Sequence, residues 1–79
     1  MNRALLTSFG KRCRALRADA GMSQEAFANS IGMDRSYYAS IETGMRNVTL
    51  VSMDKISRGL GICLSELLRE VDTPPEHNA

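Results

Sequence analysis

The sequence predicts an all-α protein, a compact five-helix bundle, and three observations lead to this fold class. Glycines interrupt the chain at fairly even intervals, at positions 10, 21, 32, 44, 59 and 61. The segments between them carry apolar residues three or four positions apart, which is the spacing of one face of an α-helix. No segment alternates apolar and polar residues as a half-buried strand does. The 79 residues are enough for one domain with a thin core.

The first helix is expected at about residues 4–20. Gly10 lies inside this helix and weakens it locally, whereas Gly21 suits the left-handed residue that often follows a helix. The apolar stripe of the helix comprises Leu5, Phe9, Cys13, Leu16 and Ala20.

Two short helices are expected next, one at about residues 24–31 and one from the N-cap Asp34 to about Thr43. Ser23 suits the N-cap of the first, because a short oxygen-bearing side chain accepts a hydrogen bond from the first helical turn. The residues assigned to the interior are Phe27, Ala28, Ile31, Met33, Tyr38, Ile41 and Met45. The outward side of the second carries Arg35, Ser36, Ala39, Ser40 and Thr43, with Tyr37 at the border.

A fourth helix is expected from the N-cap Thr49 to about Leu60, and a short fifth helix from about Leu64. The fourth has the apolar stripe Leu50, Met53, Ile56, Ser57 and Leu60, and the fifth region carries Ile62, Leu64, Leu67, Leu68 and Val71. The expected organisation is one domain over residues 1–71, followed by a flexible polar tail over residues 72–79.

Charge is distributed unevenly along the chain, although the net charge is only +1. Residues 1–58 carry nine basic and five acidic residues, a balance of +4, whereas residues 59–79 carry one basic and four acidic residues, a balance of −3. Such asymmetry is typical of a protein that binds a polyanion on one face, and ordinary solvated charge is the alternative.

The two cysteines, Cys13 and Cys63, both lie among apolar residues, which predicts buried structural thiols. A disulfide is not expected, because residues 1–6 lack the apolar stretch of a signal peptide. No apolar run is long enough to span a membrane. We therefore expect a cytoplasmic protein without a membrane contact.

The second and third predicted helices meet at a tight turn, Ile31-Gly32-Met33-Asp34. Two short helices joined in this way form a helix-turn-helix, in which the second helix can enter the major groove of DNA while the first braces it. This spacing alone is a weak signal, because any small helical bundle contains short helices separated by glycine.

A larger set of residues makes the sequence similar to a known family. The set is Arg14-Ala15-Leu16-Arg17, Gly21-Met22-Ser23-Gln24-Glu25-Ala26-Phe27-Ala28, Ile31-Gly32-Met33-Asp34-Arg35-Ser36-Tyr37, Ile41-Glu42-Thr43-Gly44, Arg46-Asn47, Thr49-Leu50, Ile56, Leu60-Gly61-Ile62 and Leu64-Ser65-Glu66-Leu67-Leu68. Over about residues 9–68 the chain resembles the phage repressor/Cro (Xre) family of DNA-binding domains. Within that family, the helix start at Asp34, the Arg46-Asn47 loop and the lack of a second domain are most similar to the controller proteins of restriction–modification systems. Tyr38, Thr43 and Val48 depart from the family, which usually has a branched aliphatic residue, a basic residue and a proline at these positions.

The resemblance implies a transcription regulator that binds double-stranded DNA through the third helix. The residues that match positions facing the bases are Arg35, Ser36, Tyr37 and Ser40. Arg35 lies in the first turn, where a guanidinium can bond to both acceptors of a guanine edge. The alternatives are a phosphate contact or solvation for Arg35, plain exposure for the two serines, and packing against Ile41 for Tyr37.

A second group is expected to contact the DNA backbone, and it comprises Arg17, Gln24, Thr43, Arg46 and Asn47. Gln24 opens the second helix, whose N-terminus attracts phosphate. The alternatives are a simple first-turn role for Gln24 and loop capping for Arg46 and Asn47. Arg17 can instead pair with Glu42, whose carboxylate would be unfavourable beside phosphates.

The last apolar residues favour a homodimer. Ile62, Leu64, Leu67, Leu68 and Val71 exceed what so small a core needs, so we assign them to a dimer interface. The alternative is that all five cover the core of the protomer. In a dimer, two recognition helices about 34 Å apart can read a palindromic operator.

No enzymatic activity, cofactor or metal is expected. The single histidine, His77, lies in the tail, and no metal-spaced cluster, phosphate-binding glycine loop or nucleophile–base pair occurs. A contact with RNA polymerase stays open, because no residue can be assigned to it. The alternatives to a regulator are the antitoxin of a toxin–antitoxin module, which binds a protein partner and its own promoter, and a bundle used only for association.

Overall fold

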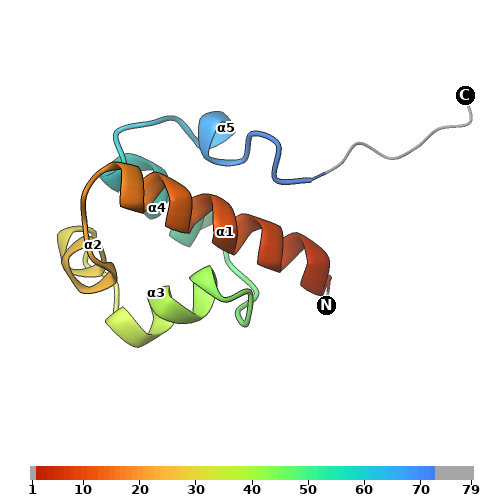
Figure 1. The fold of residues 1–79 in the computed structure, drawn as a ribbon, viewed down its shortest axis with the longest axis horizontal. Coiled ribbons are helices and arrows are strands. Elements are labelled where there is room, and N and C mark those ends of the chain that lie inside the picture. The colour runs from red at the N-terminus through yellow and green to blue at the C-terminus, as the bar shows by residue number, and fades with distance from the viewer. Residues whose placement is uncertain (1, 73–79) are drawn as a thin grey trace, which may run out of the picture.

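The structure, a computed structural model, describes residues 2–72 and consists of five helices in that range (Figure 1). Their bounds are α1 Arg3–Asp19, α2 Gln24–Ser30, α3 Arg35–Glu42, α4 Leu50–Gly59 and α5 Leu64–Leu67. No strand occurs among the described residues, so the predicted all-α bundle is confirmed. The predicted polar tail lies outside the described residues from Thr73 onward.

Side-chain caps set the start of the first four helices. Asn2, Ser23, Asp34 and Thr49 each accept a hydrogen bond from the backbone N–H three residues ahead. These bonds satisfy donors that have no partner inside the helix. The three N-caps predicted from the sequence are therefore confirmed. The short helix α5 has no side-chain cap, because the side chain of Cys63 makes no such bond.

The helices enclose one core. Figure 1 shows α1 across the front, with α2 and α3 below it, α4 behind it and α5 above it. Phe27 and Tyr38 meet edge to face at the centre, with ring centroids 5.2 Å apart and an interplanar angle of 61°, a favoured aromatic arrangement. The largest fully buried side chains are Tyr38, Phe27, Ile41, Ile56, Leu67 and Cys13. Five of the six were expected in the interior, whereas Leu67 had been assigned to the dimer interface.

Glycine allows α1 and α3 to touch through their backbones. A Cβ atom added at Gly10 would lie 2.5 Å from the carbonyl oxygens of Ile41 and Glu42. Gly44 follows α3 with a φ of 75° and approaches Thr7 so closely that an added Cβ would lie 2.9 Å from its Cα. A Cβ-free residue is therefore required on both sides of this contact, which holds the C-terminal end of α3 against α1.

Several residues expected in the core are exposed, which corrects the predicted stripes. Leu5 is exposed while its neighbour Leu6 is buried, and Ala20 lies on the surface beyond the end of α1. Met45 and Leu50 are also exposed, because the loop after α3 and the first turn of α4 project beyond the core.

The two cysteines differ in their surroundings, and neither forms a disulfide among the described residues. Cys13 is buried as predicted, but Cys63 is exposed at the start of α5, so the prediction of two buried thiols was wrong for Cys63. No helix within residues 2–72 combines the length and the apolar character needed to cross a membrane.

Candidate nucleic-acid interface

The outer side of α3 presents a polar edge to solvent. The Asp34 carboxylate accepts a hydrogen bond from the backbone N–H of Tyr37 at 3.0 Å and so defines the start of the helix. Arg35 and Ser36 are exposed in the first turn, and Ser40 is half-buried one turn later. Because the opposite side of α3 is buried in the core, this edge is available to a ligand.

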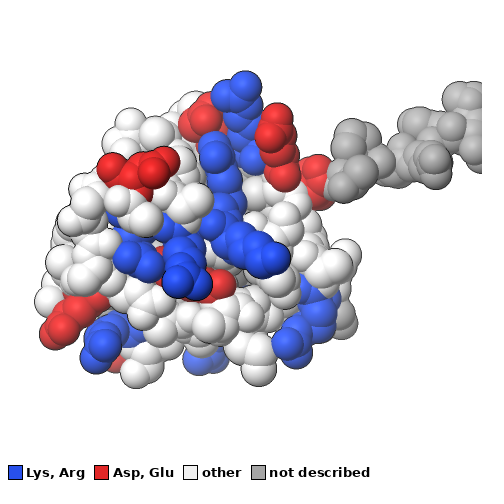
Figure 2. Space-filling view, in the orientation of Figure 1, with Lys and Arg blue, Asp and Glu red and all other residues white. Residues whose placement is uncertain are grey.

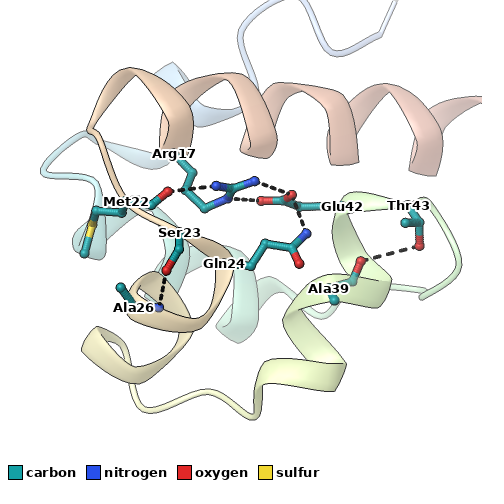
Figure 3. A network of polar contacts seen from close by, with 8 residues as sticks. All are labelled: Arg17, Met22, Ser23, Gln24, Ala26, Ala39, Glu42 and Thr43. Atoms are coloured by element: carbon teal, nitrogen blue, oxygen red, sulfur yellow. Dashed lines mark hydrogen bonds and ion pairs between the residues drawn. The ribbon is translucent and has the colours of Figure 1, made fainter.

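A buried ion pair joins α1, α2 and α3 just behind this edge (Figure 3). Arg17 donates from Nε and Nη2 to the two carboxylate oxygens of Glu42, at 2.6 and 3.0 Å, and from Nη1 to the carbonyl of Met22 at 2.8 Å. Gln24 donates from its amide to Glu42 at 2.8 Å. The Arg17 side chain is only 12% exposed and that of Glu42 only 2%. This network therefore sets the position of the start of α2 relative to the end of α3.

The ion pair changes the proton affinity of both partners. Burial alone raises the pKa of Glu42, but the Arg17 guanidinium, the nearby Tyr38 hydroxyl and the Gln24 amide outweigh it and hold the pKa below its ordinary value. The hydrogen bond to Glu42 likewise raises the pKa of Arg17. Glu42 is thus a carboxylate near neutral pH, and its charge is compensated inside the protein.

The bond to Glu42 favours the alternative role that the sequence left open for Arg17. A guanidinium with this bidentate partner and little exposed surface has few donors left for a phosphate. Gln24 is only half-buried, lies at the N-terminus of α2 and uses one amide hydrogen on Glu42, which leaves its second amide hydrogen without a partner among the described residues.

Tyr38 carries a hydroxyl that has no hydrogen-bond partner within the described residues. Burial and the nearby Glu42 carboxylate raise the pKa of this hydroxyl, which therefore stays protonated. Its ring fills the core against Phe27. The core therefore accommodates the aromatic ring of Tyr38 at a position where the family that the sequence resembles usually has a branched aliphatic residue.

Tyr37, on α3, contacts both the loop that follows this helix and α4. The guanidinium of Arg46 lies 4.9 Å from the centre of the Tyr37 ring, within range of a cation–π interaction. The Tyr37 hydroxyl is 3.3 Å from the Ser52 hydroxyl. Nε of Arg46 also donates to the Ser40 hydroxyl at 3.3 Å. These contacts bring three of the predicted DNA-binding residues into one cluster at the edge of α3.

Two further predicted backbone contacts lie at the end of α3 and beyond it. The Thr43 hydroxyl donates to the carbonyl of Ser40 at 3.1 Å, so it caps α3 while remaining exposed. Asn47 is exposed in the following loop and borders an apolar groove. Neither side chain packs in the core.

The five residues assigned to a dimer interface separate into two groups. Leu67 is fully buried and Val71 is 7% exposed, so both belong to the core of the protomer. Leu67 has no surface left to offer a partner, so its assignment is corrected, whereas Val71 borders the apolar groove beside Leu68 and keeps a little exposed surface. Ile62, Leu64 and Leu68 are half-buried and pack against the core with part of their surface exposed.

The sequence reasoning did not anticipate the role of Ser52. Its hydroxyl meets Tyr37 and also lies 3.0 Å from the Thr49 hydroxyl. The spacing of Thr49 and Ser52 places both in the capped start of α4, which was recognisable from the sequence. The contact with Tyr37 was not recognisable, because it depends on how α4 lies relative to α3.

Comparisons with known proteins agree with this geometry. A family model described as helix-turn-helix matches residues 14–67. The control protein C.MunI of a Mycoplasma species is 52% identical over 65 residues, which cover 81% of this chain and 88% of that protein.

Two solved structures extend the comparison to three dimensions. The restriction-modification controller protein C.AhdI from Aeromonas hydrophila shares 47% identity with a TM-score of 0.76, over 78% of this chain and 94% of that one. The controller protein C.Esp1396I, solved as a tetramer in complex with its natural 35-base-pair operator, shares 31% identity with a TM-score of 0.74, over 85% of this chain and 93% of that one.

Proposed function

The chain belongs to the helix-turn-helix family of DNA-binding proteins, and from this premise we propose that it is the controller protein of a restriction–modification system. In this role it regulates transcription by binding a palindromic operator as a homodimer. In this role it acts by binding DNA and not by catalysis. A regulator works where the DNA lies, which places it in the cytoplasm.

One observation carries the proposal: the exposed edge of α3 lies between two elements suited to phosphate. On one side is the N-terminus of α2 with Gln24, and on the other is the loop with Arg46. A groove-binding helix flanked by backbone contacts is the docking arrangement of helix-turn-helix proteins.

Each side chain at this edge has a proposed role. Arg35, Ser36, Tyr37 and Ser40 face the bases, with Arg35 suited to guanine. Gln24, Thr43, Arg46 and Asn47 contact the backbone. The Arg17–Glu42 pair positions α2 against α3 and keeps the carboxylate away from the phosphates.

The proposed dimer surface lies around the start of α4. Leu50 and Val51 are adjacent there and are 63% and 69% exposed. Nearby, an apolar groove of about 370 Å³ is lined by Leu5, Leu6, Phe9, Val48, Met53 and Leu68, among others. A second copy that covers Leu50, Val51 and the opening of this groove would remove exposed apolar surface from water and present two α3 helices to successive half-sites of one operator.

The test is a binding titration on the DNA upstream of the gene and on a mixed-sequence duplex, at several salt concentrations. The wild type should prefer the upstream DNA. Arg35→Ala should lose most of this preference, because one bidentate base contact contributes about 1–3 kcal/mol of discrimination. Lys55→Ala on α4 is the control and should retain the preference.

Two results would contradict the proposal at different levels. If Arg35→Ala kept the wild-type preference for the upstream DNA, the base contact assigned to Arg35 would be wrong, but the proposed function would stand. Failure of the wild type to bind any duplex at low salt would remove the function itself. No observation favours the antitoxin alternative, since the relatives described above are control proteins.

A further inference from the structure

Among the described residues, some basic side chains form ion pairs and others do not. Within residues 2–72, four arginines form ion pairs: Arg12, Arg17, Arg58 and Arg69. The remaining six basic residues have no ion-pair partner in that range, and they are Arg3, Lys11, Arg14, Arg35, Arg46 and Lys55. Five of these six lie on α1, on α3 or in the loop after α3, and only Lys55 lies on α4.

Lys11 and Arg14 stand beside the place where α1 touches α3. Lys11 directly follows Gly10 and Arg14 lies about one helical turn after it, and the Gly10 backbone meets the carbonyls of Ile41 and Glu42 at the end of α3. Arg14 is also three residues before Arg17 and therefore lies on an adjoining part of the helix surface. Both residues are exposed on α1, so their charged ends remain available to a ligand that passes this contact.

Within residues 2–72, the carboxylate at the contact between α1 and α3 does not oppose this cationic surface. Glu42, the acidic residue at that contact, is buried and already bound to Arg17. Figure 2 shows blue groups gathered over α1, whereas most red groups lie around the margin of the same face. The local field is therefore positive and suits a polyanion that passes α3.

We propose that Lys11 and Arg14 form an additional contact with the phosphate backbone of the DNA that α3 reads. This inference rests on the proposed function. Three residues span about 4.5 Å along a helix, and the long side chains of lysine and arginine can diverge from there to neighbouring phosphates of one strand. The contact adds affinity and orientation without reading sequence, because phosphates carry no base information.

The test uses the double variant Lys11→Ala/Arg14→Ala of the full chain. Affinity is measured by fluorescence anisotropy on the upstream DNA and on a mixed-sequence duplex over a series of salt concentrations. Each lost phosphate contact reduces the slope of log affinity against log salt by about 0.9, so the double variant should show a slope shallower by about 1.8. Its affinity should fall by a similar factor on both duplexes.

Two controls separate the contact from general charge and from folding. Lys55→Ala removes a positive charge that is also exposed, but on α4, and should leave the slope unchanged. Lys11→Arg/Arg14→Lys keeps both charges and should retain the wild-type slope. Circular dichroism of the alanine variant should give the wild-type helix content, since alanine favours helix.

The outcomes distinguish this inference from the proposed function. If the wild type prefers the upstream DNA and the alanine double variant keeps the same slope, the α1 contact is wrong and the function stands. If the double variant loses sequence preference but not slope, the inference is also overturned. If the wild type binds neither duplex, both fail together.

Discussion

At the scale of single residues, the Arg17–Glu42 pair makes a pH-dependent contribution to stability. The pKa of Glu42 lies below its ordinary value of 4.5 in the folded protein. The pair therefore stabilises the fold above that value, and the stabilisation is lost as the pH falls through the lowered pKa. Breaking a buried pair by removing one partner typically costs about 3–5 kcal/mol.

Arg17→Met is thus expected to lower the free energy of unfolding by about that amount at pH 7. The difference from the wild type should shrink as the pH falls, beginning where the unpaired, buried Glu42 of the variant takes up a proton and ending where the wild-type Glu42 does so, below pH 4.5. Urea unfolding at fixed protein concentration measures this difference in the free energy of unfolding. A difference that stayed constant from pH 7 to pH 3 would show that the ion pair is not its cause, and adding Glu42→Gln should remove the pH dependence.

The two thiols are expected to differ in reactivity. Burial raises the pKa of Cys13 to about 12, whereas a hydrogen bond with Ser65 lowers the pKa of the exposed Cys63. Because the thiolate is the reactive form, one thiol per chain should react rapidly with an aromatic disulfide reagent at neutral pH. The second should react only in denaturant. Rapid reaction of Cys63→Ser would contradict the burial of Cys13.

Arg46 is expected to act on DNA without regard to sequence. Arg46→Ala should weaken binding to the upstream DNA and to a mixed-sequence duplex alike, and it should flatten the salt slope by about one unit. Arg46→Lys keeps the charge and should keep the slope. A loss confined to the upstream DNA would instead indicate that the contact with Tyr37 orients a base-reading group.

At the scale of the helices, the sequence was sufficient where local chemistry decides the structure. Ser23, Asp34 and Thr49 cap three helices as expected, because a cap depends only on nearby backbone. The apolar spacing could not choose between Leu5 and Leu6, since one lies four and the other three residues before Phe9 and both intervals are helical. Only the packing of α1 on the other helices decides that Leu6 is buried.

In the candidate site, too, the sequence predicted the local features but not the contacts between helices. The exposed polar side of α3 follows from helical periodicity, and the pairing of Arg17 with Glu42 was one of two alternatives. The contact of Tyr37 with Ser52 joins residues 15 positions apart on different helices. It depends on the crossing of α3 and α4, which no local pattern encodes.

The contact between α1 and α3 is expected to tolerate no side chain at Gly10. Gly10→Ala places a Cβ 2.5 Å from two backbone carbonyls that cannot rotate away. The cost of moving the helices apart, about 1–3 kcal/mol, should exceed the gain of about 1 kcal/mol in helix propensity. Thermal unfolding measures the net loss, and Ala15→Gly on the exposed side of α1 gives the propensity term alone. A more stable Gly10→Ala would contradict the close approach of the two backbones.

At the scale of the whole molecule, the proposed function calls for two copies. One short α3 contacts few base pairs, and each base pair contributes only about 1–3 kcal/mol of discrimination. A symmetric dimer doubles the number of base pairs read and imposes a fixed spacing between half-sites. The proposed dimer surface includes Leu50 and Val51, which are exposed in the protomer.

Val51→Glu should therefore separate dimerisation from folding. Val51 is 69% exposed in the protomer, so a glutamate there is well solvated in the monomer and leaves the fold intact. In a dimer the same carboxylates would be buried without a partner, which is strongly unfavourable. Sedimentation equilibrium at tens of micromolar should give a dimer for the wild type and a monomer for the variant. The variant should keep the wild-type helix content and lose affinity for a two-half-site operator more than for a single half-site. A Val51→Glu protein that remained a dimer would place the interface elsewhere on the molecule.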